Sequence, residues 1–206
     1  MKSHLILASS SKYRRQQLAS IGIHTDAIAP NIDETPFSNE LPEQLALRLA
    51  KQKAEFVAQQ HPNALVIGSD QVACVNLNGH PSIMGKPGGY ENAKQQLIQC
   101  SGKSVEFYTA VSVQQAGVKK ALTSVEKTTV SFRALSEDQI RQYLLAETPY
   151  DCAGSFKSEG LGILLFDSIT SRDPNALIGL PLMLLRDLLA EFDVDLLTLA
   201  SQELRN

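Results

Sequence analysis

The sequence predicts an α/β fold built on a mixed, twisted sheet. Short apolar segments typical of buried strands alternate along the chain with segments in which apolar residues recur at helical spacing. Two long segments rich in β-branched residues, 104–115 and 118–132, are joined through Ala116-Gly117, which predicts an antiparallel hairpin. The chain has 206 residues, 43% of them hydrophobic, which is enough for one sizeable core.

The other elements follow from the same two periodicities. The expected order is a strand at 4–8, a helix at 12–21, a strand at 24–30, a helix at 42–60, a strand at 64–75, a helix at 90–100, the hairpin, a helix opening at Ser136, a short strand near Cys152, a strand at 162–166 and a helix at 180–192. Gly68 interrupts its strand, and a glycine there often marks a bulge or a close approach to a ligand. Ser136 and Gln139 have the spacing of a capping box.

Composition and charge are ordinary for a soluble protein; they argue against a nucleic-acid platform and leave small anionic ligands open. Charged residues make up 20% of the chain and the net charge is −3, whereas nucleic-acid platforms usually carry a basic excess. No apolar stretch approaches the ~20 residues that a membrane span needs. The three cysteines, Cys74, Cys100 and Cys152, are widely spaced, which favours reduced thiols in a cytoplasmic protein over disulfides or zinc. The length predicts one domain, or one domain with two lobes.

The first candidate site is the junction of the first strand with the first helix. Serines 9 to 11 are natural N-caps, and a helix N-terminus offers free N–H groups and a partial positive charge to an anion. Arg14, one turn into the helix, adds a bidentate phosphate donor. On the pattern alone, a well-capped surface helix with a solvated basic face is the more common explanation.

Acids and lysines elsewhere suit the same kind of ligand. Asp70 stands among apolar strand residues, where it either caps a turn or points into a cleft as a base or metal ligand. Glu34 lies in a loop and Lys53 in a helix, and residues of these types at such places are more often solvated than functional. The glycine-bounded loop 154–160 is either a plain connection or a ligand-binding loop. Together the acids suit a hard divalent cation and the lysines a polyphosphate. The sequence contains no GxSxG, HExxH or P-loop motif.

Eight motifs run in order along nearly the whole chain. They are LILASSSKYRRQQL, DET, LAKQKA, GSDQV, GKP, FYTAV, CAGSFKSEGLG and DPNALIGLPL. Together they resemble the Maf family of nucleotide pyrophosphatases. GSDQV and AGSFKSEG are similar to the branch that hydrolyses 7-methyl-GTP, whereas the dTTP/UTP branch is expected to carry a threonine after the catalytic aspartate and a glutamine in the later loop.

The resemblance implies one two-lobed domain over residues 1–206, with a cleft over a mixed sheet and a shape related to inosine triphosphate pyrophosphatases. It implies that Asp70 accepts a proton, that Glu34 helps to bind metal, and that the phosphates are held by Arg14, Lys53 and Lys86. Substrate-binding roles fall on Ser9, Tyr13, Arg14, Gln71 and Glu159, of which Tyr13, Gln71 and Glu159 occupy base-selecting positions. Lys12 departs from the family, in which a proline often opens this helix.

The activity that the resemblance implies is hydrolysis of 7-methyl-GTP to 7-methyl-GMP and diphosphate with a divalent cation, Mg²⁺ or Mn²⁺. One alternative is the same chemistry on dTTP, UTP or a broader set of nucleotides. A second is a non-catalytic, nucleotide-binding regulator of cell division. The partner expected in every case is a nucleoside triphosphate, with no nucleic acid and no membrane, in a cytoplasmic protein for which a homodimer is left open.

Overall fold

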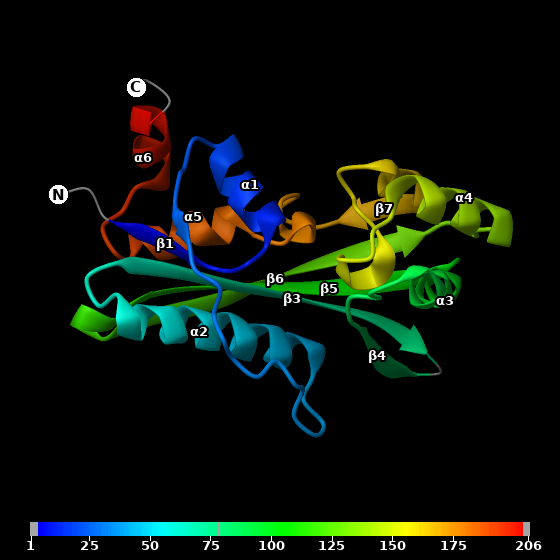
Figure 1. Ribbon diagram of the computed structural model, residues 1–206, viewed down its shortest axis with the longest axis horizontal. Helices are drawn as coiled ribbons and strands as arrows, with labels where there is room; N and C mark the ends of the chain where they lie inside the picture. Colours follow the sequence, from blue (N-terminus) through cyan, green and yellow to red (C-terminus); the bar gives the residue numbers. More distant parts are fainter. Residues whose placement is uncertain (1–3, 78, 204–206) are drawn as a thin grey trace. The chain divides into compact units, whose positions relative to one another are not determined.

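The computed structural model describes residues 4–77 and 79–203, which divide into two compact units (Figure 1). The ranges of the first unit are Met1–Asp70, Thr109–Glu126 and Asp173–Asn206, and those of the second are Gln71–Tyr108 and Lys127–Arg172. Three strands cross the boundary and so contribute residues to both units: β3 (Leu65–Leu77), β5 (Ser104–Gln115) and β6 (Lys120–Phe132).

Seven strands of the described chain form one mixed sheet, in the order β2-β1-β3-β5-β6-β7, with β4 paired to β3. Strand β1 (Leu5–Ala8) runs parallel to both β2 (Asp26–Ala27) and β3. Strands β4 (His80–Met84) and β7 (Phe166–Thr170) run antiparallel to β3 and β6, respectively. The predicted fold class, α/β with a mixed sheet, is confirmed, and so is the hairpin of β5 and β6.

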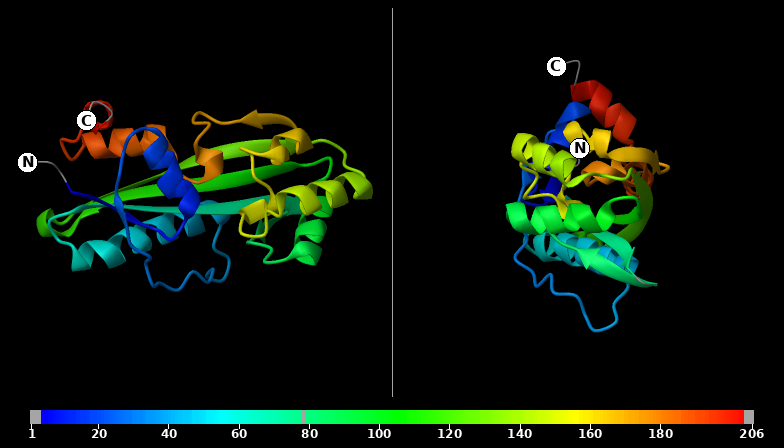
Figure 2. Two further views of the ribbon diagram at one scale, coloured as in Figure 1. Left: turned by 45° about the horizontal axis from the view of Figure 1, so that its top comes forward. Right: turned by 90° about the vertical axis from the view of Figure 1, so that its right-hand side faces the viewer.

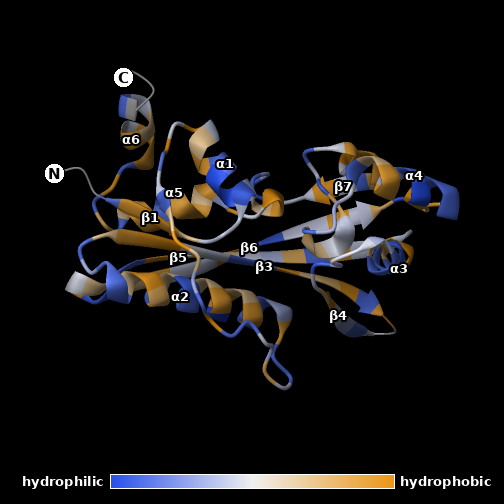
Figure 3. Cartoon of the chain, in the orientation of Figure 1, coloured by the Kyte–Doolittle hydropathy of each residue, from blue (hydrophilic) through white to orange (hydrophobic). Residues whose placement is uncertain are grey.

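In unit 1, helices cover both faces of the strands (Figure 2). Helix α2 (Pro42–Gln60) packs on the face that carries Ile6 and Ala8 of β1. The helices on the opposite face, which carries Leu5 and Leu7, are α1 (Lys12–Ser20), α5 (Leu182–Ala190) and α6 (Leu196–Glu203). This alternation explains why β1 is apolar at every position and appears uniformly apolar in Figure 3: side chains alternate between the faces, and both faces are buried.

Gly68 has a different role from the one that the sequence predicts. Strand β3 continues through it without a bulge, and Gly68 is in register with Ala8 of β1. A Cβ atom at Gly68 would lie 2.3 Å from the carbonyl oxygen of Ala50 and 2.6 Å from the backbone nitrogen of Ala54, both in α2. The glycine therefore marks the close approach of a helix backbone, and the predicted interruption of the strand is wrong.

Unit 2 has its own aromatic core. Helices α3 (Tyr90–Cys100) and α4 (Glu137–Glu147) belong to it, and Ser136 and Gln139 form the predicted capping box of α4. Four phenylalanines contact one another edge to face, with ring centroids 4.8 to 5.7 Å apart: Phe107, Phe132, Phe156 and Phe166. Such edge contacts are the favoured geometry of aromatic pairs.

Two predicted strands in unit 2 are wrong. The segment near Cys152 forms a 3-10 turn, Ala153–Ser155, in which Gly154 and Ser155 both have positive φ angles that a strand cannot accommodate. The segment predicted as a strand at 162–166 is the turn Leu161–Leu165, and β7 begins only at Phe166. There the chain folds back on itself so closely that a Cβ atom at Gly162 would lie 2.3 Å from the carbonyl oxygen of Lys157.

Two elements were not predicted. Strand β4 contains Pro81, a residue that argues against a strand and is tolerated mainly at sheet edges. Helix α6 is a short helix after the last predicted element. Within residues 4–77 and 79–203, no helix is both long enough and apolar enough to cross a membrane.

Gly68→Ala should destabilise the protein, because the new methyl group would overlap the backbone of α2 in a region that has no room to relax. Overpacking of this kind typically costs about 1–3 kcal/mol, and thermal unfolding should show a clearly lower Tm. Gly85→Ala is the matched control, since a Cβ atom there meets nothing within 4 Å. Equal Tm values for the two variants would contradict the close approach of α2 to β3.

Candidate active site

One ammonium group in unit 1 joins the two acids that the sequence singles out. Lys53 Nζ lies 2.6 Å from Asp70 Oδ1 and 2.7 Å from Glu34 Oε1. Lys53 and Asp70 are each only 7% exposed, whereas the Glu34 side chain is 56% exposed. The three groups come from helix α2, strand β3 and the loop between β2 and α2. A buried charge pair with an exposed acid beside it is typical of a functional site rather than of a core.

Strand alternation and helix periodicity explain why Lys53 and Asp70 meet. Gly68 faces α2, so Asp70, two residues further along β3, faces the same helix. Lys53 lies on the buried stripe of α2, four residues after Leu49 and four before Val57. The glycine that lets α2 approach β3 thus also brings the ammonium within hydrogen-bond distance of the carboxylate.

The environment of Asp70 sets its proton affinity. Burial raises the pKa of Asp70 above its ordinary value of 3.8, because a charged carboxylate is poorly solvated there. The ammonium of Lys53 and the guanidinium of Arg14 oppose this rise. A carboxylate with a raised pKa, held ionised by two cations, is well suited to accept a proton near neutral pH.

The N-terminus of α1 lies beside a second cation. Ser11 caps the helix by accepting a hydrogen bond from the backbone N–H of Arg14, at 3.4 Å. The hydroxyl of buried Ser9 accepts from the backbone N–H of Ser11 at 3.1 Å and from Arg14 Nη1 at 3.3 Å. Desolvation lowers the pKa of Arg14, and the carboxylates of Asp70 and Glu34 oppose that shift, so Arg14 shares the electrostatic environment of the two acids.

A segment that the sequence did not assign holds Arg14 and β3 in place. The carbonyl oxygen of Gly179 accepts hydrogen bonds from Arg14 Nε at 2.7 Å and from Ser69 Oγ at 3.0 Å. Because Ser69 alternates with Asp70, it points to the opposite face of β3. The bond from Arg14 fixes the guanidinium, and the bond from Ser69 fixes the strand next to Asp70.

Asp173 organises this segment. Its carboxylate is fully buried and accepts from the backbone N–H groups of Asn175 at 2.8 Å and Met183 at 2.7 Å. Gln17 Nε2 of α1 donates to the carbonyl oxygen of Asn175 at 2.8 Å. The sequence did carry a signal for it, since Asp-Pro-Asn is a turn sequence in which the aspartate bonds to nearby backbone.

The predicted site residues divide between the units. Ser9, Tyr13, Arg14, Glu34, Lys53 and Asp70 belong to unit 1, and Gln71, Lys86 and Glu159 to unit 2. Tyr13 is half-buried, with the ammonium of Lys12 4.9 Å from its ring centroid, so its ring face already accepts a cation. The substrate-binding and catalytic roles of all nine residues stay predictions.

In unit 2, Lys86 and Glu159 are exposed and Gln71 is half-buried. The loop that carries Glu159 is held by Glu147 at the end of α4. Glu147 Oε2 accepts from the backbone N–H of Leu161 at 2.8 Å, and the Glu147 carbonyl oxygen accepts from Lys157 Nζ at 3.0 Å. The loop is therefore an ordered structure that presents Glu159 to solvent.

The donors in unit 1 fit a hard divalent cation of the kind that keeps much of its water. Glu34 and Asp70 provide two carboxylates that converge on one point, now taken by the Lys53 ammonium. No group of three or more His, Cys, Asp or Glu side chains suited to a metal occurs among the described residues. Mg²⁺ is commonly bound by one or two carboxylates together with substrate phosphates and water.

A family model described as "Maf-like protein" matches residues 4–192. The chain belongs to the Maf family. This match confirms the resemblance seen in the motifs, and it includes residues of both units of this Maf protein.

Curated relatives of this Maf protein share about half of its residues. It is 51% identical over 187 residues to a 7-methyl-GTP pyrophosphatase of Nitrosococcus oceani, covering 91% of this chain and 92% of the relative. It is 51% identical over 194 residues to a 7-methyl-GTP pyrophosphatase of Bordetella pertussis, covering 94% of each. With a 7-methyl-GTP pyrophosphatase of Pseudoalteromonas translucida it shares 47% identity over 201 residues, covering 98% of each.

Among solved structures, the Ham1 protein of Staphylococcus aureus matches 77% of this chain and 88% of its own, at 17% identity and a TM-score of 0.47. The relationship of shape with inosine triphosphate pyrophosphatases stays a prediction from the sequence.

The electrostatics of Asp70 predict the pH dependence of turnover. If ionised Asp70 accepts the proton, kcat/KM should fall as the pH decreases through the pKa of Asp70, above the ordinary value of 3.8. Lys53→Ala removes a cation that lowers this pKa, so the acid limb of the residual activity should move to higher pH. Lys51→Ala is the control, because Lys51 is an exposed lysine of the same helix. An acid limb that stays in place, or moves to lower pH, in Lys53→Ala would contradict the assignment.

Proposed function

We propose that this Maf protein hydrolyses 7-methyl-GTP to 7-methyl-GMP and diphosphate. The observation that carries the proposal is the buried Asp70 carboxylate, paired with Lys53 and near Arg14. Two curated relatives named 7-methyl-GTP pyrophosphatase, each 51% identical over more than 90% of this chain, support the choice of substrate. The motifs GSDQV and AGSFKSEG support the same choice over dTTP and UTP.

The residues of unit 1 have separate roles in this reaction. Asp70 accepts a proton from a water molecule while the oxygen of that water forms a bond to the α-phosphorus. The bond between that phosphorus and the bridging oxygen breaks, and diphosphate leaves with the bonding electrons. Arg14 donates hydrogen bonds to phosphate oxygens, and Lys53 provides positive charge where negative charge develops. The partial positive charge at the N-terminus of α1 attracts the same anion.

A divalent cation, Mg²⁺ or Mn²⁺, is part of the proposal. Glu34 and Asp70 would hold it, and when bound it would neutralise charge on the phosphates. In unit 2, Lys86 holds a phosphate, while Gln71 and Glu159 read the base. The widely spaced cysteines support a cytoplasmic location, and a homodimer is left open.

The non-catalytic alternative is disfavoured by the acids. A site that only binds a polyanion has no need of a general base, whereas Asp70 has the environment of one. Asp70 is moreover buried at a cost that a purely binding surface has no reason to bear.

A nucleotide panel tests the function. Release of diphosphate from 7-methyl-GTP, GTP, UTP and dTTP should be fastest for 7-methyl-GTP, should stop in excess EDTA and should return with Mg²⁺ or Mn²⁺. Asp70→Asn is the control, because it keeps the shape of the side chain, and loss of a general base costs about 10²–10⁴-fold in rate. Full turnover in excess chelator would reject the metal, and near wild-type turnover by a folded Asp70→Asn protein would reject the role of Asp70.

Base selection has its own prediction. N7-methylation gives the guanine a positive charge, and a cation over an aromatic face gains roughly 0.5–2 kcal/mol. Tyr13→Ala should therefore lose about 2- to 30-fold more kcat/KM on 7-methyl-GTP than on GTP, whereas Tyr13→Phe, which keeps the ring, should not. Glu159→Gln should weaken selection for the methylated base, because the carboxylate accepts from the guanine N1–H and amine and repels pyrimidine carbonyls. Equal wild-type kcat/KM values for 7-methyl-GTP and GTP would reject this specificity and leave the diphosphate-releasing activity standing.

A further inference from the structure

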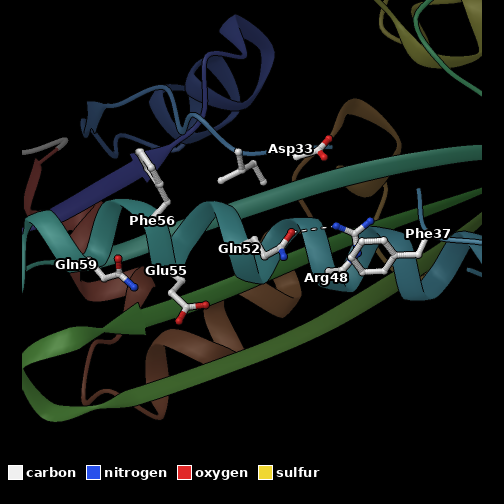
Figure 4. A pocket seen from close by; sticks show the side chains of 8 residues that line it. Asp33, Phe37, Arg48, Gln52, Glu55, Phe56 and Gln59 are labelled. Carbon is white, nitrogen blue, oxygen red and sulfur yellow. Dashed lines mark hydrogen bonds between the residues drawn. The ribbon is translucent and has the colours of Figure 1, made fainter. Parts of the chain in front are cut away.

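Glu34 lies in a segment of unit 1 that has almost no regular structure. Between β2 and α2, residues 28–41 contain neither helix nor strand, only a turn at Ser38 and Asn39. The segment runs over a hollow of about 360 Å³ against the outer face of α2, lined by Ile32, Asp33, Phe37, Arg48, Gln52, Glu55, Phe56 and Gln59 (Figure 4). Ile28 packs against the core of unit 1, but residues 33–39 are all exposed, so polar contacts are the main interactions that position the part of the segment around Glu34.

Arg48 of α2 makes most of those contacts. Its Nε lies 2.6 Å from Glu40 Oε1 and its Nη2 lies 2.8 Å from Glu40 Oε2, a bidentate pair in which the Glu40 side chain is only 8% exposed. The guanidinium also lies over the ring of Phe37, 4.0 Å from its centroid, and Nη1 donates to Gln52 on the next turn of α2. The Glu40 carboxylate raises the pKa of Arg48, so the pair is firmly ionised.

The same guanidinium reaches the residue next to Glu34. Arg48 Nη2 donates to the carbonyl oxygen of Thr35 at 3.1 Å. The backbone N–H of Thr35 donates to Asp33 Oδ1 at 2.9 Å, which closes a tight turn around Glu34. Both peptide groups of Thr35 are thus held, one of them by Arg48. Because Lys53 lies on the same helix, α2 carries both the group that holds the segment and the group that Glu34 contacts.

We propose that Arg48, clamped by Glu40, is a positioning residue that holds the Glu34 carboxylate at Lys53. The inference rests on the proposed function, because it takes Glu34 to act in turnover. Arginine is needed at this position, since its planar fork bonds to Glu40 and Thr35 together, which the point charge of a lysine cannot reproduce.

A double-mutant cycle on diphosphate release from 7-methyl-GTP tests the role. Misplacement of a catalytic group by about 1 Å can cost about 10²-fold, so Arg48→Ala should lower kcat about 10- to 100-fold in the wild-type background. In the Glu34→Ala background the same change should cost less than about twofold, because residues that act through one another are not additive. Arg48→Lys should recover little of the kcat that Arg48→Ala loses. Arg141→Ala is the matched control, since this exposed arginine pairs with Asp138 of its own helix at the surface.

The outcomes separate this inference from the function on which it rests. Equal losses from Arg48→Ala in both backgrounds would show that Arg48 serves the fold alone and would overturn the positioning role, as would full turnover by Glu34→Ala. An inactive wild-type protein would overturn the function together with the inference. If Arg48→Ala does not fold, Glu40→Gln takes its place in the cycle, because it keeps the shape of the partner and weakens only the clamp.

Discussion

The candidate site in unit 1 is organised around one interaction, the buried ion pair between Lys53 and Asp70. Their charged atoms lie 2.6 Å apart on neighbouring elements, and each side chain is almost fully removed from water. Removing one partner of such a pair typically costs about 3–5 kcal/mol, because the remaining charge stays buried alone. A hydrophobic pair of the same volume would serve the fold as well or better. The pair is therefore best explained by chemistry, and the closeness of α2 and β3 at Gly68 is what makes it geometrically attainable.

Around this pair, the surrounding residues fall into fixed and adjustable groups. Asp173 is buried and holds the segment whose Gly179 carbonyl accepts hydrogen bonds from Arg14 and Ser69, so the side of the site that carries Arg14 is held by a network of hydrogen bonds. Glu34 is more than half exposed and reaches Lys53 from an irregular segment. The contrast fits a site in which the base and its cations are preorganised, while the outer acid depends on side-chain clamps such as that of Arg48.

Sequence patterns predicted the elements whose signals are local. Helix α2 begins and ends at the predicted residues because proline opens it and its apolar stripe is regular. Patterns failed where contacts with other parts of the chain determine the backbone conformation. At Gly68 the apparent interruption of the strand is a packing contact, and at 161–165 an apolar run forms a turn.

In the candidate site, too, local signals could be predicted and contacts between distant residues could not. Asp70 stood out as an acid among apolar strand residues and Lys53 as one of several cations suited to a polyphosphate, but their pairing depends on which distant residues meet. The same holds for the contacts of Arg48 and for the bond from Met183 to Asp173, whereas the turn at Asp173 has a local signal in Asp-Pro-Asn.

The central claim is that this buried pair serves hydrolysis at the α-phosphorus of a nucleoside triphosphate. The most direct test is turnover of 7-methyl-GTP in oxygen-18-labelled water, with mass spectrometry of both products. If water attacks the α-phosphorus, the label appears in 7-methyl-GMP and the diphosphate stays unlabelled. Label found in the diphosphate, or phosphate and a nucleoside diphosphate in place of these products, would contradict the account.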